Sequence, residues 1–585
     1  MKDQNYVLSY DIGTTGDKTC LYRIGPKLEL VDSCVAEYPL QILPNGGAEQ
    51  NVDDWWGAIC ETTNAILSRT KLERSEIRGI AFCCQMLGSI IVDLTGQPLR
   101  NPMIWMDSRA TKQIEEFLYT GLVRISNFNA LITLKSLRIT GALAGSSKDP
   151  LWKYHWVREN EPEVFRKVYK WLDVKDYLLL RCTGHYGMTQ DSAHLTFLYD
   201  TRPGHLGWHK GLCDTFRVDM RHLPPVVKST DIVGGLTREA ADEMGLDEGT
   251  PVFGGGGDLA LITIGSGCAE QYDTHIYIGT SGWVAANVER RIVDISNFMG
   301  SIIGAIPGCY NYVGEQETSG VCLQWIRDLL ALDRVAASAQ SESATKKDGL
   351  KDPYDAVNKA ASETTPGAGN IIFTPWLHGN RSPRDDPYAR GIFFNIDLKA
   401  DAGMLFRAVM EGVAYHNRWM LDALEKKISR QNSIRLVGGG AKSEVWCQIM
   451  ADVTGRTIEA IENPQNAGAF GAAVVSGVGL GLLPSFHDAK SFIPVKKRYT
   501  PRTEFKEIYD HNFKAFAKLY ENNKKLFRLL NQTRNAVAVQ PGCEDDVSRA
   551  WCRFTGGFVN RVVRISWFLS LCCAFDLLCR CGKPV

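Results

Sequence analysis

Short runs of apolar residues alternate with stretches of helical spacing along most of the chain. Four runs have the length and composition of buried strands: I-R-G-I-A-F-C-C at 77–84, V-F-G-G at 252–255, H-I-Y-I-G at 275–279 and R-L-V-G-G at 435–439. Residues 443–455 instead repeat apolar residues at helical spacing, with Ser443 as the expected N-cap and Gly455 as the expected C-cap. This alternation predicts an α/β fold.

A five-residue pattern occurs twice, each time between two strand-like runs. I-G-T-T-G occupies 12–16 and I-G-T-S-G occupies 278–282. Two hairpins with the same turn predict two similar domains that face one cleft, and 585 residues are too many for one hydrophobic core. We place the boundary near Thr250, so that the domains span 1–249 and 250–530. The alternative is a chance match, because Gly and Thr are common in turns.

The character of the chain changes at about residue 531. Six of the 17 cysteines fall within 531–585, together with an apolar run from 565 to 579. That run is short for a membrane span and contains Asp576. We therefore expect a Cys-rich apolar tail that forms a peripheral or packed helix or stays disordered.

Composition narrows the class of protein. The chain is 44% hydrophobic and 23% charged, and its formal net charge is zero. No net field favours nucleic acid or an anionic membrane as a partner. The N-terminal residues M-K-D-Q-N-Y-V-L-S-Y-D lack the apolar segment of a secretory signal, so we expect a cytoplasmic protein.

The first repeated turn has the residue types of a phosphate site. The turn and its flanks carry Asp11, Gly13, Thr14, Thr15, Gly16 and Lys18. Glycines let the backbone approach an anion, and the hydroxyl and ammonium groups add donors and positive charge. Asp11 would repel phosphate unless a divalent cation lay between them, so the turn predicts a Mg–nucleotide site. The second turn, at Gly279 and Thr280, would bind the same phosphates from the other side. A plain β-hairpin is the alternative for either turn alone.

Two further glycine clusters carry candidate chemistry. Neither a Walker A loop nor a G-x-G-x-x-G in a first βαβ unit occurs, which disfavours P-loop and nicotinamide-binding proteins. Glycines 438–440 lie between a strand and an amphipathic helix, which suits contact with a nucleoside. Asp258 follows four glycines, and a carboxylate there can accept the proton of an attacking hydroxyl. The alternatives are a tight strand–helix turn for the first cluster and an N-cap for Asp258.

A series of short motifs runs through the chain. The motifs are Y-D-I-G-T-T-G-D-K, E-Q-N-V-D-D-W-W, Q-M-L-G-S, W-M-D-S-R-A, P-L-W-K-Y-H-W-V-R-E-N, V-K-D-Y-L-L-L-R-C-T-G, G-G-G-G-D-L-A-L, I-G-T-S-G, H-G-N-R-S-P-R-D-D-P-Y-A-R-G-I-F-F, R-A-V-M-E-G-V-A-Y-H and G-G-G-A-K-S-E-V-W-C-Q-I-M-A-D-V-T-G. In order and spacing the chain resembles the FGGY carbohydrate kinases, closest to their xylulokinase-like branch. The resemblance runs from about Tyr6 to about Leu530.

The resemblance implies two actin-like, ribonuclease-H-like domains with ATP and a sugar or polyol in the cleft between them. Asp258 would be the catalytic base, and Asp11 and Asp258 would hold Mg²⁺. The phosphates would be bound by Thr14, Thr15, Lys18, Gly279 and Thr280, and the adenosine by Gly439, Gly440 and Ala441. The sugar would be bound by Gln85, Met86, Asp107 and Arg109, next to Asp258. A homodimer is left open.

Two positions depart from the xylulokinase pattern. Those enzymes typically carry Q-M-H-G and G-D-N, where this chain has leucine at Leu87 and Leu259. A site that hydrogen-bonds a hydroxyl discriminates strongly, so we expect a sugar or polyol kinase whose best substrate is not D-xylulose. A less hydroxylated, deoxy or differently configured acceptor would suit the leucines. Competing hypotheses are a non-catalytic sugar- or nucleotide-binding regulator and a different ATPase of the actin-like fold.

Overall fold

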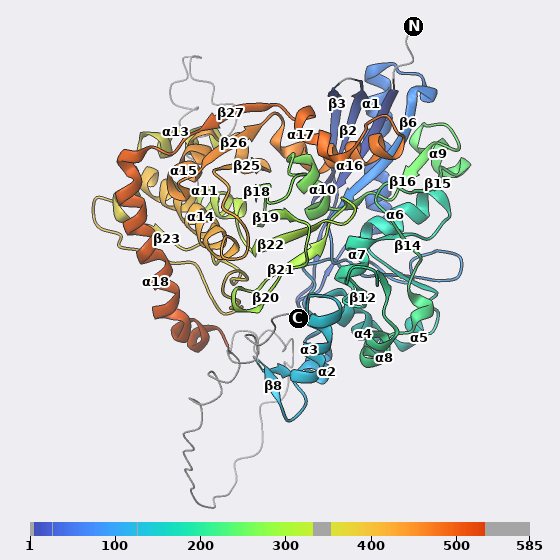
Figure 1. The fold of residues 1–585 in the computed structure, drawn as a ribbon, viewed down its shortest axis with the longest axis horizontal. Coiled ribbons are helices and arrows are strands. Elements are labelled where there is room, and N and C mark those ends of the chain that lie inside the picture. Colours follow the sequence, from blue (N-terminus) through green and yellow to red (C-terminus); the bar gives the residue numbers. More distant parts are fainter. Residues whose placement is uncertain (1–4, 26, 126, 331–352, 533–585) are drawn as a thin grey trace, which may run out of the picture. The chain divides into compact units, whose positions relative to one another are not determined.

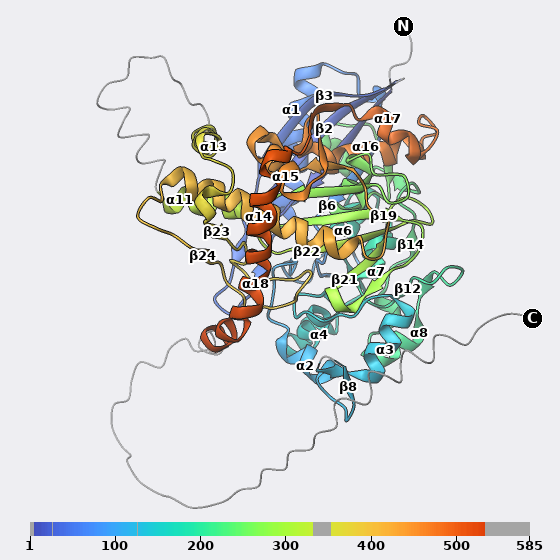
Figure 2. The same ribbon diagram turned by 60° about the vertical axis from the view of Figure 1, so that its left-hand side comes forward.

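The structure, a computed structural model, describes residues 5–25, 27–125, 127–330 and 353–532. The predicted tail 531–585 lies outside these residues except for its first two. The described chain forms two mixed β-sheets with helices packed against both (Figures 1 and 2). The α/β prediction is confirmed. None of the helices in the described ranges is long and apolar enough to span a bilayer.

The first sheet is buried on both faces of its central strand. Its order is β15-β16-β6-β1-β2-β3, with β17 also paired to β6. The strands are β1 (Asn5–Ile12), β2 (Gly16–Ile24), β3 (Leu28–Glu37), β6 (Ile77–Cys84), β15 (Ile232–Gly235), β16 (Pro251–Phe253) and β17 (Gly256–Gly257). Alternation along β1 puts Leu8 and Tyr10 in the core with α1 (Val52–Thr70), and Val7 in the core with α16 (Ala467–Gly479).

The second sheet repeats the pairing of the first. Its order is β20-β21-β22-β19-β18-β25-β26-β27. The strands are β18 (Thr274–Ile278), β19 (Gly282–Val288), β20 (Val293–Asp294), β21 (Met299–Ile303), β22 (Tyr310–Gln316), β25 (Ser433–Val437), β26 (Thr457–Ile461) and β27 (Val495–Tyr499). Both β3-β2-β1-β6-β16 and β22-β19-β18-β25-β26 pair antiparallel, antiparallel, parallel, parallel. The predicted hairpins β1–β2 and β18–β19 therefore occupy the same place in each sheet.

Two helices pack closely between the sheets (Figure 1). These are α10 (Asp258–Gly265) and α16. A Cβ on Gly265 would lie 1.7 Å from the carbonyl oxygen of Ala467, and one on Gly471 would lie 2.0 Å from that of Leu261. Glycine at both positions lets the two backbones meet.

The domain boundary near residue 250 stays a prediction. β16 and β17 follow that residue in the chain, yet both pair with β6 of the first sheet. The first sheet thus continues to the residue that precedes α10, and Asp258 begins that helix at the sheet's edge.

Several other helices position the site from outside. They are α4 (Pro150–Asn160), α6 (Val174–Thr183), α14 (Ala402–Leu424), α15 (Glu444–Thr454) and α18 (Lys506–Asn531), which packs against α14 and α15 (Figure 2). The predicted caps of α15 are confirmed. The Ser443 hydroxyl accepts a hydrogen bond from the Trp446 N–H, and Gly455 has a φ of +65° and donates to the Ala451 carbonyl. These caps fix the start of α15 directly after the glycine-rich loop.

Candidate active site

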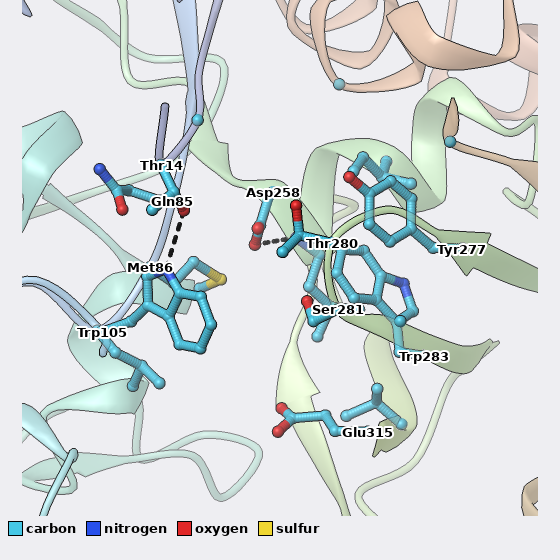
Figure 3. Close-up of a pocket in the computed structure, with 18 of the residues that line it drawn as sticks. Thr14, Gln85, Met86, Trp105, Asp258, Tyr277, Thr280, Ser281, Trp283 and Glu315 are labelled. Carbon is cyan, nitrogen blue, oxygen red and sulfur yellow. Dashed lines mark hydrogen bonds between the residues drawn. The ribbon is translucent and has the colours of Figure 1, made fainter. Parts of the chain in front are cut away.

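A cavity of about 610 Å³ brings the two repeated turns together. Figure 3 shows Asp258 between the Thr14 and Gln85 side of the cavity and the Thr280 and Ser281 side. The predicted site residues that line it are Asp11, Thr14, Thr15, Lys18, Gln85, Met86, Asp258, Thr280 and Gly439. Five others do not line it: Gly279, Gly440, Ala441, Asp107 and Arg109.

The first turn is braced by residues outside the hairpin. The Gly13 N–H donates to the Gly16 carbonyl at 3.0 Å and closes the turn. The indole N–H of Trp105 donates to the Thr14 hydroxyl at 3.0 Å (Figure 3), and the side-chain amide of Gln50 donates to the Thr14 carbonyl at 2.8 Å. The Thr14 hydroxyl is therefore held in one orientation toward the cavity.

The second turn is braced by backbone alone. The Gly279 N–H donates to the Ser281 carbonyl at 3.0 Å, which closes the turn. The N–H groups of Ser319 and Gly320, at the start of α11 (Gly320–Leu329), donate to the carbonyls of Thr280 and Gly279 at 3.0 and 2.7 Å. Gly279 lies on the side of the turn that packs against Tyr277, since a Cβ there would lie 2.4 Å from the Tyr277 hydroxyl oxygen. Thr280, Ser281 and Gly282 are the members of the turn that line the cavity.

Asp258 begins α10 and is half-buried in the cavity wall. Gly257 is the N-cap, so the alternative of Asp258 as an N-cap is wrong by one residue. The Asp258 carboxylate accepts a hydrogen bond from the Leu259 N–H at 2.8 Å. The Gly257 N–H donates to the Asp191 carboxylate at 2.7 Å. Burial raises the pKa of Asp258 to about 7, and the charges of Asp11 and Glu315 act in the same direction. A carboxylate with this pKa can take up a proton near neutral pH.

Asp11 and Lys18 face each other across the first hairpin. They are register partners on β1 and β2. Burial raises the pKa of Asp11, and Lys18 opposes this. The Lys18 ammonium donates to the carbonyl of Gln465, in the loop before α16. A Cβ on Gly468 would come within 2.9 Å of the Asp11 carboxylate, so glycine is needed there for α16 to approach.

Gln85 lines the cavity and carries a buried side-chain acceptor without a partner in the described chain. Its backbone N–H donates to the Ile12 carbonyl at 2.8 Å, and its side-chain N–H donates to Gln50 at 2.8 Å. Its side-chain oxygen is buried and has no hydrogen-bond partner among the described residues. A buried polar atom without a partner costs free energy unless a ligand or water satisfies it, so this oxygen suits a substrate hydroxyl.

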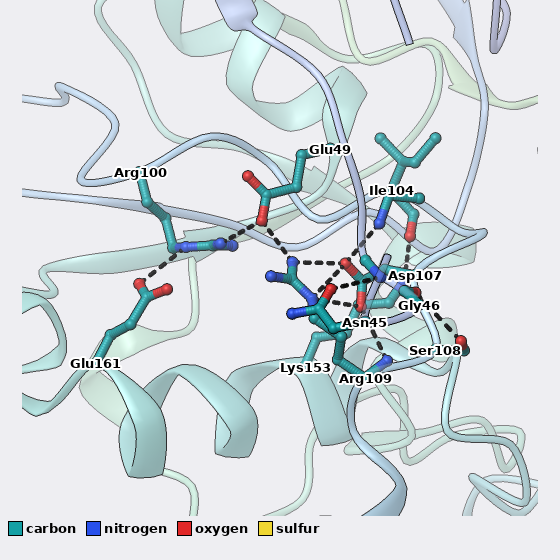
Figure 4. Close-up of polar contacts among 12 residues, drawn as sticks. Asn45, Gly46, Glu49, Arg100, Ile104, Asp107, Ser108, Arg109, Lys153 and Glu161 are labelled. Atoms are coloured by element: carbon teal, nitrogen blue, oxygen red, sulfur yellow. Dashed lines mark hydrogen bonds and ion pairs between the residues drawn. The ribbon is translucent and has the colours of Figure 1, made fainter. Parts of the chain in front are cut away.

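Asp107 and Arg109 belong to a polar network beside the cavity (Figure 4). The Asp107 carboxylate is fully buried and accepts bonds from the Ala48 N–H and from the backbone and guanidinium of Arg109. Arg109 also pairs with Glu49 at 2.5 Å, and Glu49 pairs with Arg100. Sugar binding by Asp107 and Arg109 stays a prediction that requires this network to open.

The glycine-rich loop reaches the cavity through two of its glycines. Gly438 has a φ of +90°, and both Gly438 and Gly439 line the cavity. Apart from its own chain neighbours, no heavy atom of the described chain lies within 4 Å of a Cβ built on Gly439. Gly440 turns the other way, since a Cβ there would lie 2.4 Å from the Ile278 side chain, and Ala441 is buried. Of the three residues predicted to contact adenosine, Gly439 is therefore the one with open space in front of it.

Comparisons with known proteins agree with this geometry. Residues 6–265 match the N-terminal domain of the FGGY family of carbohydrate kinases, and residues 275–480 match its C-terminal domain. The chain belongs to this family. It is therefore an ATP-dependent carbohydrate kinase, a phosphotransferase that acts on a sugar hydroxyl.

Curated relatives of this FGGY kinase carry two different substrate names. A xylulose kinase of Staphylococcus epidermidis is 29% identical over 526 residues, which cover 89% of this chain and 97% of that protein. A gluconokinase of Bacillus subtilis is 28% identical over 508 residues, which cover 85% and 92%. The crystal structure of a ligand-bound xylulose kinase from Lactobacillus acidophilus matches with a TM-score of 0.77 at 23% identity, covering 90% of this chain and all of that one, which shows the shared fold.

Several cavity residues of this kinase were not expected from the sequence. The main ones are Trp105, Asp149, Phe197, Glu315 and Arg381. Trp105 and Arg381 lie inside two of the motifs quoted above, W-M-D-S-R-A and the one that begins H-G-N-R-S-P. The sequence therefore marked these segments, but it did not indicate that these two side chains line the cavity. Glu315 is an ordinary strand residue of β22, and only its position in the second sheet brings it to the cavity.

Proposed function

We propose that this FGGY kinase transfers the γ-phosphate of ATP to a hydroxyl of a ketose or polyol, with Asp258 as general base. One observation carries the proposal: Asp11, Asp258 and both Gly-Thr turns line a single cavity. Phosphoryl transfer depends mainly on positioning the reactants and offsetting charge, and this arrangement supplies both. A cytoplasmic location stays a prediction.

The two carboxylates fit a divalent cation. Asp11 and Asp258 are both half-buried in the cavity wall, and the charge of Asp11 is one cause of the raised pKa of Asp258. A carboxylate whose ionised form is destabilised by a neighbouring carboxylate suits an oxygen-ligated cation, which relieves the repulsion. Asp11 and Asp258 are therefore the residues that would hold Mg²⁺. When bound, Mg²⁺ would offset negative charge on the phosphates.

Residues of the chain account for the remaining steps. The hydroxyls of Thr14, Thr15 and Thr280 and the ammonium of Lys18 would orient the phosphates. Asp258 would accept the proton that the sugar hydroxyl loses as the new O–P bond forms. Apolar lining residues such as Met86 and Trp105 would reduce the water that competes as acceptor.

The sugar would bind between Gln85 and the leucines that depart from the xylulokinase pattern. Leu87 and Leu259 both line the cavity. Gln85 offers its unpartnered oxygen to one hydroxyl, and the leucines offer none. We therefore keep the hypothesis that the preferred acceptor is less hydroxylated than, or configured differently from, D-xylulose.

ADP release with Mg-ATP tests the function across ketoses, polyols and deoxy sugars. We expect turnover that depends on an acceptor and falls by at least about a hundredfold in Asp258→Asn, because general-base catalysis contributes about that much or more. Asp452→Asn is the control, since Asp452 is a buried carboxylate outside the cavity that pairs with Arg502. Binding of sugar and nucleotide without turnover would support the regulator hypothesis instead.

A further inference from the structure

One wall of the cavity carries an ion pair that the proposed mechanism does not use. The guanidinium of Arg381 lies 3.0 Å from the carboxylate of Glu315, and both residues line the cavity. The backbone holds the two segments together, because the Ser382 N–H donates to the Glu315 carbonyl at 3.1 Å. Figure 3 shows the Glu315 side chain extending from the second sheet into the same space as Asp258.

Neighbouring carboxylates hold Arg381 in place. Glu315 contributes most to the raised pKa of Arg381, and Glu317 and Asp149 add to it. The nearby ammonium of Lys148 is also engaged, 3.2 Å from the Glu317 carboxylate. Both cations of this wall therefore already have a carboxylate partner.

The cavity as a whole has an excess of acidic groups. Among the described residues that line it, seven are acidic: Asp11, Asp17, Glu37, Asp149, Asp258, Glu315 and Glu317. Two are basic, Lys18 and Arg381. Lys18 lies beside the first Gly-Thr turn, and Arg381, the other basic residue that lines the cavity, is already paired within the described chain. An acceptor with a carboxylate would lie next to like charges, which weakens its binding.

We propose that Glu315 is a specificity residue: by occupying Arg381 it excludes sugar acids, so the acceptor is an uncharged ketose or polyol and not an aldonate. The inference rests on the proposed function. The inference decides between the two kinds of acceptor named for the curated relatives, a neutral sugar and a sugar acid. A hydroxyl-rich neutral chain can donate hydrogen bonds to Glu315 and Asp149, whereas an aldonate would compete with them for Arg381.

Matched acceptor pairs test the inference, because they differ mainly at the carboxylate. The pairs are sorbitol with D-gluconate and xylitol with D-xylonate, each measured as kcat/KM by ADP release. In the wild type we expect the neutral member of at least one pair to be preferred by about a hundredfold or more, which corresponds to two steps of 1.4 kcal/mol. A wild type that uses an aldonate better than its neutral partner would overturn the proposal.

Glu315→Gln tests the residue itself. The amide keeps the shape of the side chain and frees Arg381, so we expect the neutral-to-aldonate ratio to fall by about tenfold or more, mainly through better use of the aldonate. Glu317→Gln, which frees Lys148, should act in the same direction. Glu459→Gln is the control, because Glu459 pairs with Arg435 at 2.8 Å outside the cavity. An unchanged ratio in Glu315→Gln would refute the role of Glu315, whatever the result in Glu317→Gln.

Binding separates failure of the inference from failure of the proposed function. If no acceptor is turned over, the kinase proposal fails, and the same pairs are compared by calorimetric titration in the presence of Mg-ADP. Weaker binding of the aldonate that recovers in Glu315→Gln would still support the charge selectivity. Tighter binding of the aldonate to the wild type, or binding of neither pair member to any variant, would contradict it.

Discussion

The ammonium of Lys153, inside α4, donates a hydrogen bond of 2.8 Å to the carbonyl oxygen of Leu87. Leu87 has a φ of +64°, a conformation that costs a residue with a Cβ about 1–2 kcal/mol. The same ammonium donates to the carbonyl of Ile104 at 2.7 Å. Leu87 and Trp105, the neighbour of Ile104, both line the cavity. Lys153 thus connects two segments of the cavity wall where we propose that the acceptor binds.

Lys153→Met should loosen these two segments. We expect the free energy of unfolding to fall by about 2–4 kcal/mol, because two hydrogen bonds to buried carbonyls are lost. We also expect KM for the acceptor to rise several-fold with little change in KM for ATP. Lys135→Met is the control, since Lys135 donates to the Gly211 carbonyl and the Thr215 hydroxyl away from the cavity. Urea unfolding and initial rates measure both effects; equal KM values in the two variants would argue for a purely structural role.

Restoring polar groups at the two leucines should change the substrate. In the double variant Leu87→His, Leu259→Asn we expect kcat/KM for D-xylulose to rise by about tenfold or more. The new side chains can hydrogen-bond sugar hydroxyls, and such a site favours a substrate that carries the matching hydroxyl. Leu94→His is the control, because Leu94 is 75% exposed and does not line the cavity. A wild type that already prefers D-xylulose by a wide margin would contradict the hypothesis.

The repeated hairpins and the caps of α15 were predictable because their signals are local. A Gly-Thr turn between two apolar runs specifies a hairpin, and Ser443 and Gly455 mark the ends of one helix by their own backbone chemistry. The first-turn threonines, Lys18 and Asp258 reach the cavity because each lies on or beside such a locally specified element.

The rest of the site depends on contacts between distant segments. Glu315 and Arg381 meet only because the loop after β23 (Ile372–Phe373) pairs its backbone with β22. Asp107 and Arg109 have the residue types of a sugar site, but Glu49 and the Ala48 N–H come from another segment and engage them. Charge and spacing along the sequence do not specify which polar groups find partners inside the protein.

The packing of α10 on α16 predicts a strong effect of a single methyl group. In Gly265→Ala the Cβ would lie 1.7 Å from the Ala467 carbonyl, so the helices must separate. We expect a loss of at least about 2 kcal/mol of stability, as for other overpacked cores, together with lower activity because α10 carries Asp258. Gly57→Ala in α1 is the matched control, because outside its own helix turn no described heavy atom lies within 4 Å of its Cβ. Alanine there should stabilise the protein by up to about 1 kcal/mol, and urea unfolding compares the two.

Buried His275 should make stability depend on pH in the acid range. Its Nε2 accepts the indole N–H of Trp283 at 2.9 Å, and burial lowers its pKa to about 3. An unfolded histidine titrates near about 6.5, so below that pH the unfolded chain binds a proton that the folded chain does not. The contribution of neutral His275 is therefore complete above about pH 6.5 and is lost as pH falls toward 3.

His275→Gln isolates this contribution, because glutamine can still accept the Trp283 N–H but does not titrate. Between pH 6 and pH 5 we expect the free energy of unfolding of the wild type to fall more steeply than that of the variant, by up to about 1.4 kcal/mol per pH unit. The buried His194 and His416, whose pKa values burial lowers to about 4, act in the same direction in both proteins and cancel in the difference. His205→Gln, at an exposed position, should leave the wild-type slope unchanged. Parallel slopes for the wild type and His275→Gln in urea unfolding would show that His275 is protonated in the folded protein.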